Sequence, residues 1–393
     1  MVQNGARKRV VLLGATGSIG ENTLRVIRAN PDRLELAGIA GRNSVEELAG
    51  IAREFNLRHV SVYDHDACAR AQRSGLFDRS VQIYPGPEGL REIAALPAAD
   101  LVLVAVVGIA GLEPTLHAIR AGKEIALASK EVLVLAGKFV TRAARDNKVP
   151  IIPVDSEHNA LFQSLQGSPL RHVSRLMLTA SGGPFREYSI EQMMAVKPED
   201  AMRHPNWSMG PKITVDCSTM ANKGLELIEA HWLFDVEPDR IEVVVHPQSI
   251  VHSIVEFVDG SMLAYLSPPS MTFAIQHALL YPDRGGVVDS PLDFARTHNL
   301  EFHPPDPDRF PCLRLAREAA ETGGVAPAIF NAANEIAVEA FLKKTIGYLA
   351  ISRVIEDTLS RFSHYDPESL DAVLDTDRSA RRIAAEIINL EVS

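Results

Sequence analysis

Short apolar runs alternate with helix-length amphipathic segments through the first 155 residues of the chain. Several runs are almost wholly aliphatic, as strands covered on both faces must be. The predicted strands are 9–13, 34–40, 59–63, 81–84, 101–107, 124–128 and 149–154, with helices such as 21–29 and 44–55 between them. Because strand–helix alternation is typical of a parallel sheet covered by helices, residues 1–155 are predicted to form a doubly wound, Rossmann-type α/β domain.

The central part of the chain, 156–290, has a different pattern. Residues 250–258 and 261–266 read as two strands that flank Asp259 and Gly260. An Asp-Gly pair suits the positive φ angles of a type I′ hairpin turn. We therefore predict an α+β domain here, with a mainly antiparallel sheet.

A proline-rich stretch and a helical region follow. Four prolines fall within residues 302–311 and stiffen a predicted linker over 291–311. Beyond it, apolar residues recur every three or four positions, among them Ile329, Ala332, Ala333, Ile336, Ala340 and Phe341. This spacing predicts a small α-helical domain over 312–393.

Composition narrows the class of protein. The 393 residues include 40 Lys+Arg and 50 Asp+Glu, a net charge of −10, which argues against nonspecific binding of nucleic acid or anionic membranes. No apolar run reaches the ~20 residues of a membrane span, and the N-terminal stretch lacks the apolar core of a signal peptide. Cys68, Cys217 and Cys312 are widely spaced, without a CxxC pair. We therefore expect a cytoplasmic protein.

The first predicted strand runs directly into GATGSIG, residues 14–20, and a helical pattern follows. Glycines at three-residue spacing let the backbone turn tightly and approach a pyrophosphate, which then lies at the N-terminus of the helix. A tight turn without a ligand is the alternative.

The second strand ends at Gly41-Arg42-Asn43, where an NAD site usually has an acid. A cation there favours NADP(H), unless Arg42 is only a solvated surface residue.

Acidic residues follow the last strand of the first domain. Asp155 and Glu157 are two apart, so in an extended segment both side chains project from one face. Paired carboxylates of this kind suit Mg²⁺ or Mn²⁺. The alternative is a helix-capping acid followed by an acid in the first turn. Glu226 is the candidate third carboxylate.

Three further segments have residues that suit ligand binding. In Asn222-Lys223-Gly224-Leu225-Glu226, the lysine and asparagine can hold a phosphate, although Lys223 and Glu226 also fit a plain exposed i,i+3 pair. Ser181 precedes two glycines at a strand end, as in an anion-binding loop. The loop 203–210 contains a Trp and a Met, which either enter the core or close over a ligand.

Taken together, the motifs resemble one family, the 1-deoxy-D-xylulose 5-phosphate reductoisomerases of the non-mevalonate isoprenoid pathway. The resemblance runs in order through nearly the whole chain. It is carried by GATGSIG, AGRN (40–43), LASKE (127–131), VDSEHNA (154–160), ASGGPF (180–185), HPNWSMGPKITVD (204–216), NKGLE (222–226), HPQSIVHS (246–253) and NAANE (331–335). HPNWSMG and NKGLE are the most specific of these.

The resemblance implies roles for individual residues. NADPH contacts are implied for Gly14, Thr16, Gly17, Ser18, Ile19, Gly41, Arg42, Asn43, Ser129, Glu131 and Gly210. The implied divalent metal ligands are Asp155, Glu157 and Glu226. Substrate contacts are implied for Lys130, Ser156, Glu157, Ser181, His204, Trp207, Met209, Cys217, Asn222, Lys223 and Glu226, with Lys130, Glu157 and Glu226 as catalytic residues.

Two positions depart from the common family pattern. Cys217 stands where the family typically has a phosphate-binding serine, and a thiol is a poorer hydrogen-bond donor than a hydroxyl. The neighbouring Ser218 is a candidate substitute, with a small backbone shift. Ser129 stands where an asparagine commonly precedes the Lys-Glu pair near the cofactor. These departures bear on the strength of phosphate and cofactor binding.

The resemblance also implies the reaction. A ketose phosphate is rearranged by retro-aldol cleavage and aldol rejoining, and the aldehyde is reduced by NADPH to 2-C-methyl-D-erythritol 4-phosphate. Negative charge develops on adjacent oxygens, which a divalent metal stabilises. The implied assembly is a homodimer. The rival functions are a simple NADP-dependent dehydrogenase and a non-catalytic NADP(H) sensor, neither of which needs three carboxylates.

Overall fold

The structure is a computed structural model that describes residues 7–202 and 209–392. Contacts divide the chain into two compact units, which are described separately. Unit 1 comprises Met1–Val132, Phe139–Asn159 and Ser270–Pro291, and unit 2 comprises Leu133–Lys138, Ala160–Pro269 and Leu292–Ser393. The four-part division predicted from the sequence stays a prediction.

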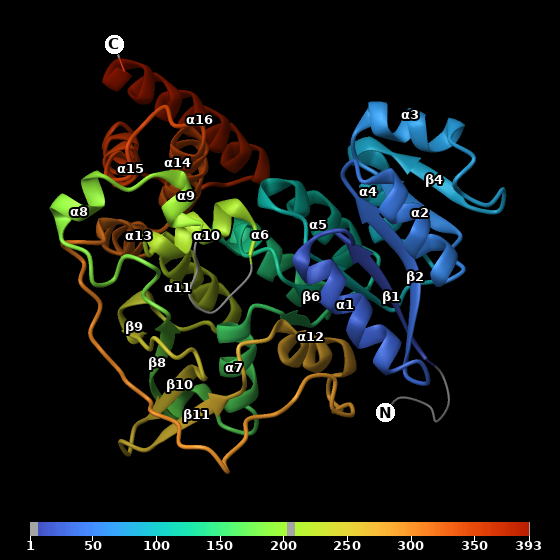
Figure 1. Ribbon diagram of the computed structural model, residues 1–393, viewed down its shortest axis with the longest axis horizontal. Helices are drawn as coiled ribbons and strands as arrows, with labels where there is room; N and C mark the ends of the chain where they lie inside the picture. The colour runs from blue at the N-terminus through green and yellow to red at the C-terminus, as the bar shows by residue number, and fades with distance from the viewer. Residues whose placement is uncertain (1–6, 203–208, 393) are drawn as a thin grey trace. The chain divides into compact units, whose positions relative to one another are not determined.

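A seven-stranded parallel sheet forms the centre of unit 1 (Figure 1). Its strands are β1 (Lys8–Leu13), β2 (Leu34–Gly41), β3 (His59–Val62), β4 (Gln82–Pro85), β5 (Leu101–Val104), β6 (Glu124–Leu127) and β7 (Ile151–Pro153), in the order β4-β3-β2-β1-β5-β6-β7. The predicted doubly wound sheet is confirmed. The strand order reverses beside β1, and ligands of such sheets bind at that point, beyond the carboxyl ends of the strands.

The fifth strand is shorter than its apolar sequence predicts. It ends at Val104, and a loop then leads to the short 3-10 helix Gly108–Gly111. Gly108 has a φ of +70°, which turns the chain away from the sheet. Apolar composition alone did not show this turn.

Helices cover the sheet of unit 1. They are α1 (Ser18–Ala29), α2 (Val45–Glu54), α3 (His65–Arg73), α4 (Gly86–Ala94), α5 (Leu112–Arg120) and α12 (Met271–Leu280), while α6 (Glu131–Asp146) and α7 (Ser156–Ser164) are shared with unit 2. Helix α12 comes late in the sequence yet packs against α1 (Figure 1). Asp289 secures this return, because its carboxylate accepts hydrogen bonds from Ser270, Thr272 and Arg25.

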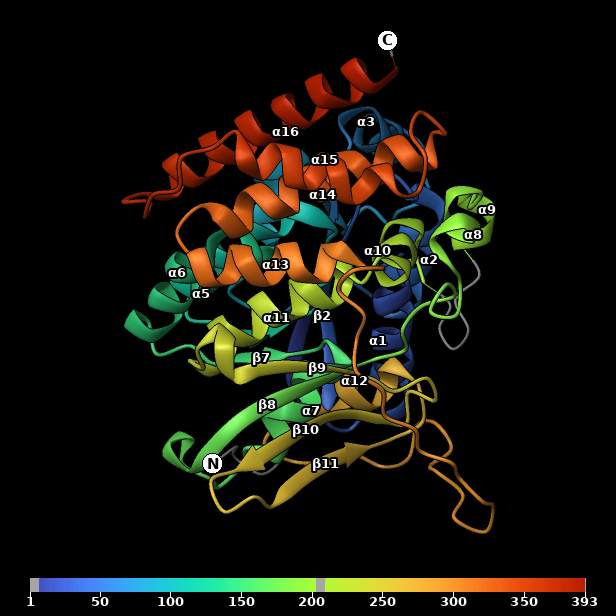
Figure 2. The same ribbon diagram turned by 90° about the vertical axis from the view of Figure 1, so that its left-hand side faces the viewer.

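Unit 2 contains a mixed four-stranded sheet (Figure 2). Its strands are β8 (Val173–Ala180), β9 (Ile241–Val245), β10 (Val251–Phe257) and β11 (Met262–Leu266), in the order β11-β10-β8-β9. Only the β8–β9 pair is parallel. The predicted hairpin is present, but the type I′ turn was wrong. The connection has four residues, and of these only Gly260 has a positive φ, as in a type I turn followed by a left-handed glycine.

The remaining helices of unit 2 are α8 (Ile190–Met194), α9 (Pro198–Ala201), α10 (Pro211–Ser218), α11 (Ala221–Phe234), α13 (Pro311–Thr322), α14 (Ala326–Leu342), α15 (Ala350–Ser360) and α16 (Leu370–Val392). The last four form the predicted C-terminal helical region (Figure 2). A single apolar cluster joins these helices to α11 and the sheet, with Phe185, Phe330 and Phe341 fully buried. A smaller apolar cluster of Val325, Ile329, Ala332 and Ala380 lies within the C-terminal helices, so the larger cluster is the main core of unit 2.

Within residues 7–202 and 209–392, no helix is both long enough and apolar enough to cross a bilayer.

Candidate functional site

The glycine loop lies where β1 gives way to α1. Gly14 has a φ of +93°, and a Cβ there would lie 2.4 Å from the Ala105 carbonyl oxygen, so only glycine fits. A Cβ on Gly20 would be equally close to the carbonyl oxygens of Gly14 and Ala15. Gly17, the N-cap of α1, is exposed and has no side chain with which to cap the first N–H groups of the helix. This is a ready anion site.

The residues around this loop are arranged for a nucleotide. Thr16 and Ile19 are half-buried, and Ser18 is exposed. Gly41 is buried at the end of β2, and the Arg42 and Asn43 that follow it are exposed. The predicted cation therefore lies at the strand end where a ribose would be recognised.

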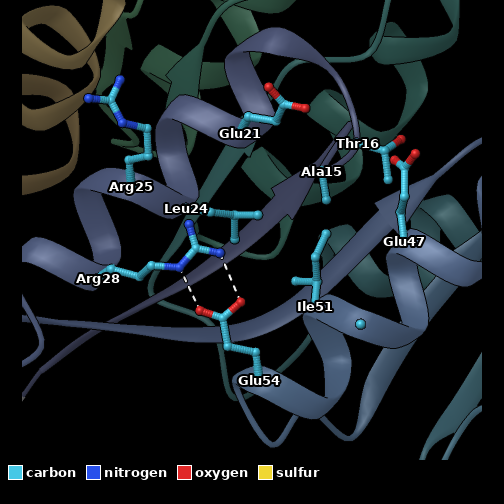
Figure 3. Close-up of a pocket in the computed structure, with 10 residues that line it drawn as sticks. Ala15, Thr16, Glu21, Leu24, Arg25, Arg28, Glu47, Ile51 and Glu54 are labelled. Carbon is cyan, nitrogen blue, oxygen red and sulfur yellow. Dashed lines mark hydrogen bonds and ion pairs between the residues drawn. The ribbon is translucent and has the colours of Figure 1, made fainter.

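A pocket of about 480 Å³ opens between α1 and α2 (Figure 3). It borders the glycine loop at Thr16, and it is also lined by Glu21, Glu47 and Glu54. Arg28 pairs with Glu54 in it, through a 2.5 Å contact from Nε to Oε1. Arg25 and Arg28 also line the pocket, so its charged lining is mixed. The start of α1 is the better-suited place for an anion.

Two residues of the LASKE segment lie beside the carboxyl ends of β5 and β6. The Ser129 hydroxyl donates to the Val106 carbonyl oxygen at 2.5 Å, so this residue fastens the loop after β5. Ser129 is 5% exposed and Glu131, in the first turn of α6, is 8% exposed. Both lie beyond the carboxyl ends of the strands, where sheets of this class bind dinucleotides. The Ser129 hydroxyl, however, already donates its hydrogen bond to the protein backbone.

Lys130 and Asp155 form a buried ion pair in unit 1. Lys130 Nζ lies 2.6 Å from Asp155 Oδ2, and the two side chains are 7% and 11% exposed. His158 Nδ1 lies 3.5 Å from the other carboxylate oxygen. Burial by itself raises the pKa of Asp155, but the charge of Lys130 and the hydrogen bond from His158 outweigh it and hold the pKa well below its usual value. Asp155 is therefore an anion that already attracts a cation.

The backbone from Asp155 to Glu157 is not extended, so that prediction was wrong. Helix α7 begins at Ser156, and the Asp155 carboxylate accepts a hydrogen bond from the Glu157 N–H at 3.3 Å. The Ser156 hydroxyl donates to Glu157 Oε2 at 2.5 Å. The alternative reading, a helix-capping acid followed by a first-turn acid, describes the local geometry. It leaves both carboxylates at one helix N-terminus, a geometry that is compatible with a metal.

In unit 2, one turn of α11 gathers the Asn222, Lys223 and Glu226 side chains. Asn222 Nδ2 donates to Glu226 Oε1 at 2.5 Å, and Lys223 Nζ contacts Glu226 Oε2. Their exposures are 8%, 4% and 1%, so the plain exposed pair considered from the sequence was wrong. Charged side chains are rarely buried to this extent unless they are paired with an opposite charge or bind a ligand.

Gly224 serves packing. A Cβ at this position would lie 2.3 Å from the Ala316 Cβ, so the glycine lets α13 approach α11 closely. The close approach explains how a helix with three polar residues in one turn remains buried.

The Ser181 loop packs against the last turn of α10. Gly182 and Gly183 have φ angles of +79° and +69°. A Cβ on Gly183 would lie 2.8 Å from the Cys217 carbonyl oxygen, so the glycine permits this contact. Ser181 is half-buried and its hydroxyl accepts a hydrogen bond from the Gly183 N–H at 3.2 Å. Ser181 and Cys217 thus lie on two segments in direct contact.

Ser218 does not stand in for the missing serine. It is fully buried, and its hydroxyl donates to the Val215 carbonyl oxygen at 2.7 Å within α10. Cys217 is half-buried instead. Of these two neighbours, the thiol of Cys217 is therefore the more accessible side chain, and the hydroxyl of Ser218 is enclosed in the protein.

The predicted lid lies mostly outside the described residues, as do His204 and Trp207. Met209 is half-buried, and Gly210 is exposed and caps α10.

Sequence reasoning gave no role to His252, which lies on β10 with Nε2 2.9 Å from Ser267 Oγ. Burial, together with a smaller contribution from the charge of Lys223, lowers the pKa of His252 to about 4. A histidine within a strand of the HPQSIVHS segment was the available signal.

The fold and the glycine loop define the class, a dinucleotide-binding α/β oxidoreductase. Three family models match the chain. Residues 10–137 match 1-deoxy-D-xylulose 5-phosphate reductoisomerase, residues 151–234 its C-terminal domain, and residues 266–383 the DXP reductoisomerase C-terminal domain. The chain belongs to the 1-deoxy-D-xylulose 5-phosphate reductoisomerase family, and it is an NADP-dependent oxidoreductase.

Curated relatives of that name cover nearly the whole chain. The protein of Chlorobium phaeobacteroides is 50% identical over 377 residues, which are 96% of this chain and 98% of the relative. The protein of Clostridium perfringens is 46% identical over 386 residues, 97% and 100% of the two chains.

Solved structures of the family match over the same extent. The enzyme of Zymomonas mobilis in complex with NADPH is 43% identical, covers 98% of this chain and 99% of its own, and has a TM-score of 0.91. A reductoisomerase in complex with NADPH, fosmidomycin and magnesium is 42% identical, covers 98% of both chains and has a TM-score of 0.90.

Proposed function

We propose that this chain converts 1-deoxy-D-xylulose 5-phosphate to 2-C-methyl-D-erythritol 4-phosphate, with NADPH and a divalent metal, as a step of the non-mevalonate isoprenoid pathway. The observation that carries the proposal is the buried turn of Asn222, Lys223 and Glu226 on α11. A simple dehydrogenase or an NADP(H) sensor needs the glycine loop but has no use for this turn. Names of relatives that cover 96–97% of the chain support the same reaction.

NADPH fits the residues of unit 1. The glycine loop approaches a pyrophosphate without any Cβ in the way, and Thr16, Gly17, Ser18 and Ile19 offer donors or contacts. Arg42 supplies the charge for a 2′-phosphate, with Gly41 and Asn43 beside it. The remaining proposed contacts are Gly14, Ser129 and Glu131 of unit 1, and Gly210, which belongs to unit 2. These residues bind and orient the cofactor, which supplies the hydride.

A divalent metal fits the chemistry of Asp155, Glu157 and Glu226, which offer only hard oxygen ligands. In this structure Lys130 provides the positive charge beside Asp155. Such a metal, Mg²⁺ or Mn²⁺, would supply Lewis-acid stabilisation of charge on adjacent substrate oxygens. The proposal requires Glu226 of unit 2 to meet the two acids of unit 1.

The residues of the chain then divide the remaining work. Asn222 and Lys223, with Ser181 and Cys217, bind the phosphate, and the anchored phosphate keeps the fragments in place between cleavage and rejoining. Lys130 holds or moves a proton at a substrate oxygen, next to Ser156. Met209 covers the carbon chain, with His204 and Trp207 as the lid residues that exclude water.

A direct assay tests the function. Purified protein is mixed with 1-deoxy-D-xylulose 5-phosphate, NADPH and Mg²⁺, and NADPH oxidation is followed at 340 nm. We expect oxidation that requires both the sugar phosphate and the metal. Chelation by EDTA should stop it, and added Mg²⁺ or Mn²⁺ should restore it. Oxidation that persists in EDTA would favour a metal-independent dehydrogenase.

Replacing the thiol at the phosphate position is expected to help binding. In Cys217→Ser a hydroxyl, the stronger donor, replaces a thiol on the half-buried side of α10. We expect the KM for the sugar phosphate to be unchanged or lower by up to about fivefold, which is the effect of one neutral hydrogen bond. The NADPH KM should not move. A large loss of activity would show that the thiol has another role.

We further propose that the chain is a cytoplasmic homodimer. Strand β11 is an edge of its sheet, and Met262, Leu263 and Leu266 on it are 53%, 50% and 38% exposed. An apolar edge of this kind invites pairing with another chain, and a second copy would cover it. Sedimentation velocity of the wild-type protein tests the assembly.

A further inference from the structure

Two fully buried asparagines lie in the C-terminal helical region, which contributes no residue to the proposed site. Asn331 and Asn334 belong to the NAANE segment of α14, and both are 0% exposed. Asparagine is a poor choice for a helix core, because each buried amide must be hydrogen-bonded to offset its lost hydration. The two residues differ in their partners.

Asn334 reaches out of its helix to α10. Its Nδ2 donates to Asp216 Oδ1 at 2.9 Å, across 118 residues of sequence. Asp216 is 1% exposed, and its other oxygen lies 2.8 Å from Lys212 Nζ in the first turn of the same helix. Asn334 and Lys212 thus hold one buried carboxylate between them. Asn331, in contrast, donates to Glu335 within α14 at 3.2 Å.

The helix held in this way is the one that bears the phosphate position. Asp216 directly precedes Cys217, and the Tyr348 hydroxyl donates to the Ser218 carbonyl oxygen at 2.6 Å on the same turn. The Ser181 loop packs on this turn through Gly183. A shift of α10 would therefore move the Cys217 side chain and the surface against which Ser181 is placed.

We propose that Asn334 is a positioning residue for phosphate binding, acting through the Asp216 carboxylate that fixes α10. The inference rests on the proposed function for the identity of the substrate. It assigns to the C-terminal helices a part in substrate affinity without any contact with the substrate. Small displacements of a binding group are costly when a rigid ligand must be held by several donors at once.

The test compares two equally buried asparagines of one helix. For Asn334→Ala we expect the KM for the sugar phosphate to rise about fivefold, the effect of one lost or misplaced hydrogen bond. The NADPH KM should rise less, because Asp216 directly precedes Cys217, whereas Gly210 lies at the other end of α10. For the control Asn331→Ala we expect a lower melting temperature and an unchanged KM. Equal KM values in the two variants would overturn the inference, as would an equal rise in both KM values for Asn334→Ala.

Two additions keep the outcomes separate. Asn334→Leu fills the same space without a donor and serves if the alanine variant does not fold. Binding of inorganic phosphate, measured by calorimetry, gives a readout independent of turnover. If the wild type binds phosphate but does not turn over the sugar phosphate, the proposed function fails, and weaker phosphate binding in Asn334→Ala alone still supports the inference. If Asn334→Ala and the wild type bind phosphate equally, the inference fails.

Discussion

Replacing Glu226 by Gln is expected to lower kcat about a thousandfold, the size of effect seen when charge stabilisation is removed from a transition state. The amide keeps the shape of the side chain and an oxygen that can still accept from Asn222. It removes the negative charge that the proposed metal site requires, so the loss should be in turnover and metal affinity. All of the proposed NADPH contacts except Gly210 belong to unit 1, and Glu226 is not among them, so the NADPH dissociation constant should change less than about twofold.

Three measurements check this result. Steady-state rates at saturating Mg²⁺ give kcat, calorimetry gives metal affinity, and fluorescence titration gives the NADPH dissociation constant. Glu335→Gln is the matched control, because Glu335 pairs with Arg381 through a 2.7 Å contact in the C-terminal helices. It loses a partly buried carboxylate without touching α11. Wild-type turnover in Glu226→Gln would refute the metal assignment.

Some features of the fold and of the site were predictable from the sequence, and others were not. The parallel sheet was predictable because aliphatic runs and the glycine loop are local signals in the sequence. Right-handed crossover connections then restrict the order of the strands. The burial of Lys223 and Glu226 was not predictable from their spacing. It depends on Gly224, which lets Ala316 of α13 approach from about ninety positions away.

Local helix geometry explains the other two errors. The pair Asp155 and Glu157 looked extended because two-residue spacing fits a strand, but the helix begins at Ser156 and Asp155 caps it. Ser218 looked like a substitute for Cys217 because the two are adjacent in sequence. On a helix, adjacent residues face in directions about 100° apart, and Ser218 turned to the interior. In each case the residue type was read correctly and its direction was not.

Reversing the charge of Arg42 is expected to change the preferred cofactor. In Arg42→Asp the exposed cation at the end of β2 becomes a carboxylate, which repels a 2′-phosphate and can accept hydrogen bonds from ribose hydroxyls. We expect kcat/KM for NADPH to fall about a hundredfold, equal to roughly 3 kcal/mol, the worth of a charge-assisted hydrogen bond, while kcat/KM for NADH rises. Activity at saturating NADH should approach that of the wild type.

The control for this prediction is another exposed arginine of unit 1, Arg28 in the last turn of α1. Arg28→Ala breaks the ion pair with Glu54 in the pocket between α1 and α2, without removing a charge from the strand end. It should leave the ratio of the two kcat/KM values unchanged. If Arg42→Asp kept the wild-type preference for NADPH, the 2′-phosphate would have to be recognised elsewhere, and Asn43 would be the next residue to replace. Arg42 and Arg28 are both exposed, so the melting temperatures of the two variants should stay close to that of the wild type. A changed ratio of kcat/KM for NADPH to kcat/KM for NADH then reports cofactor recognition and not folding.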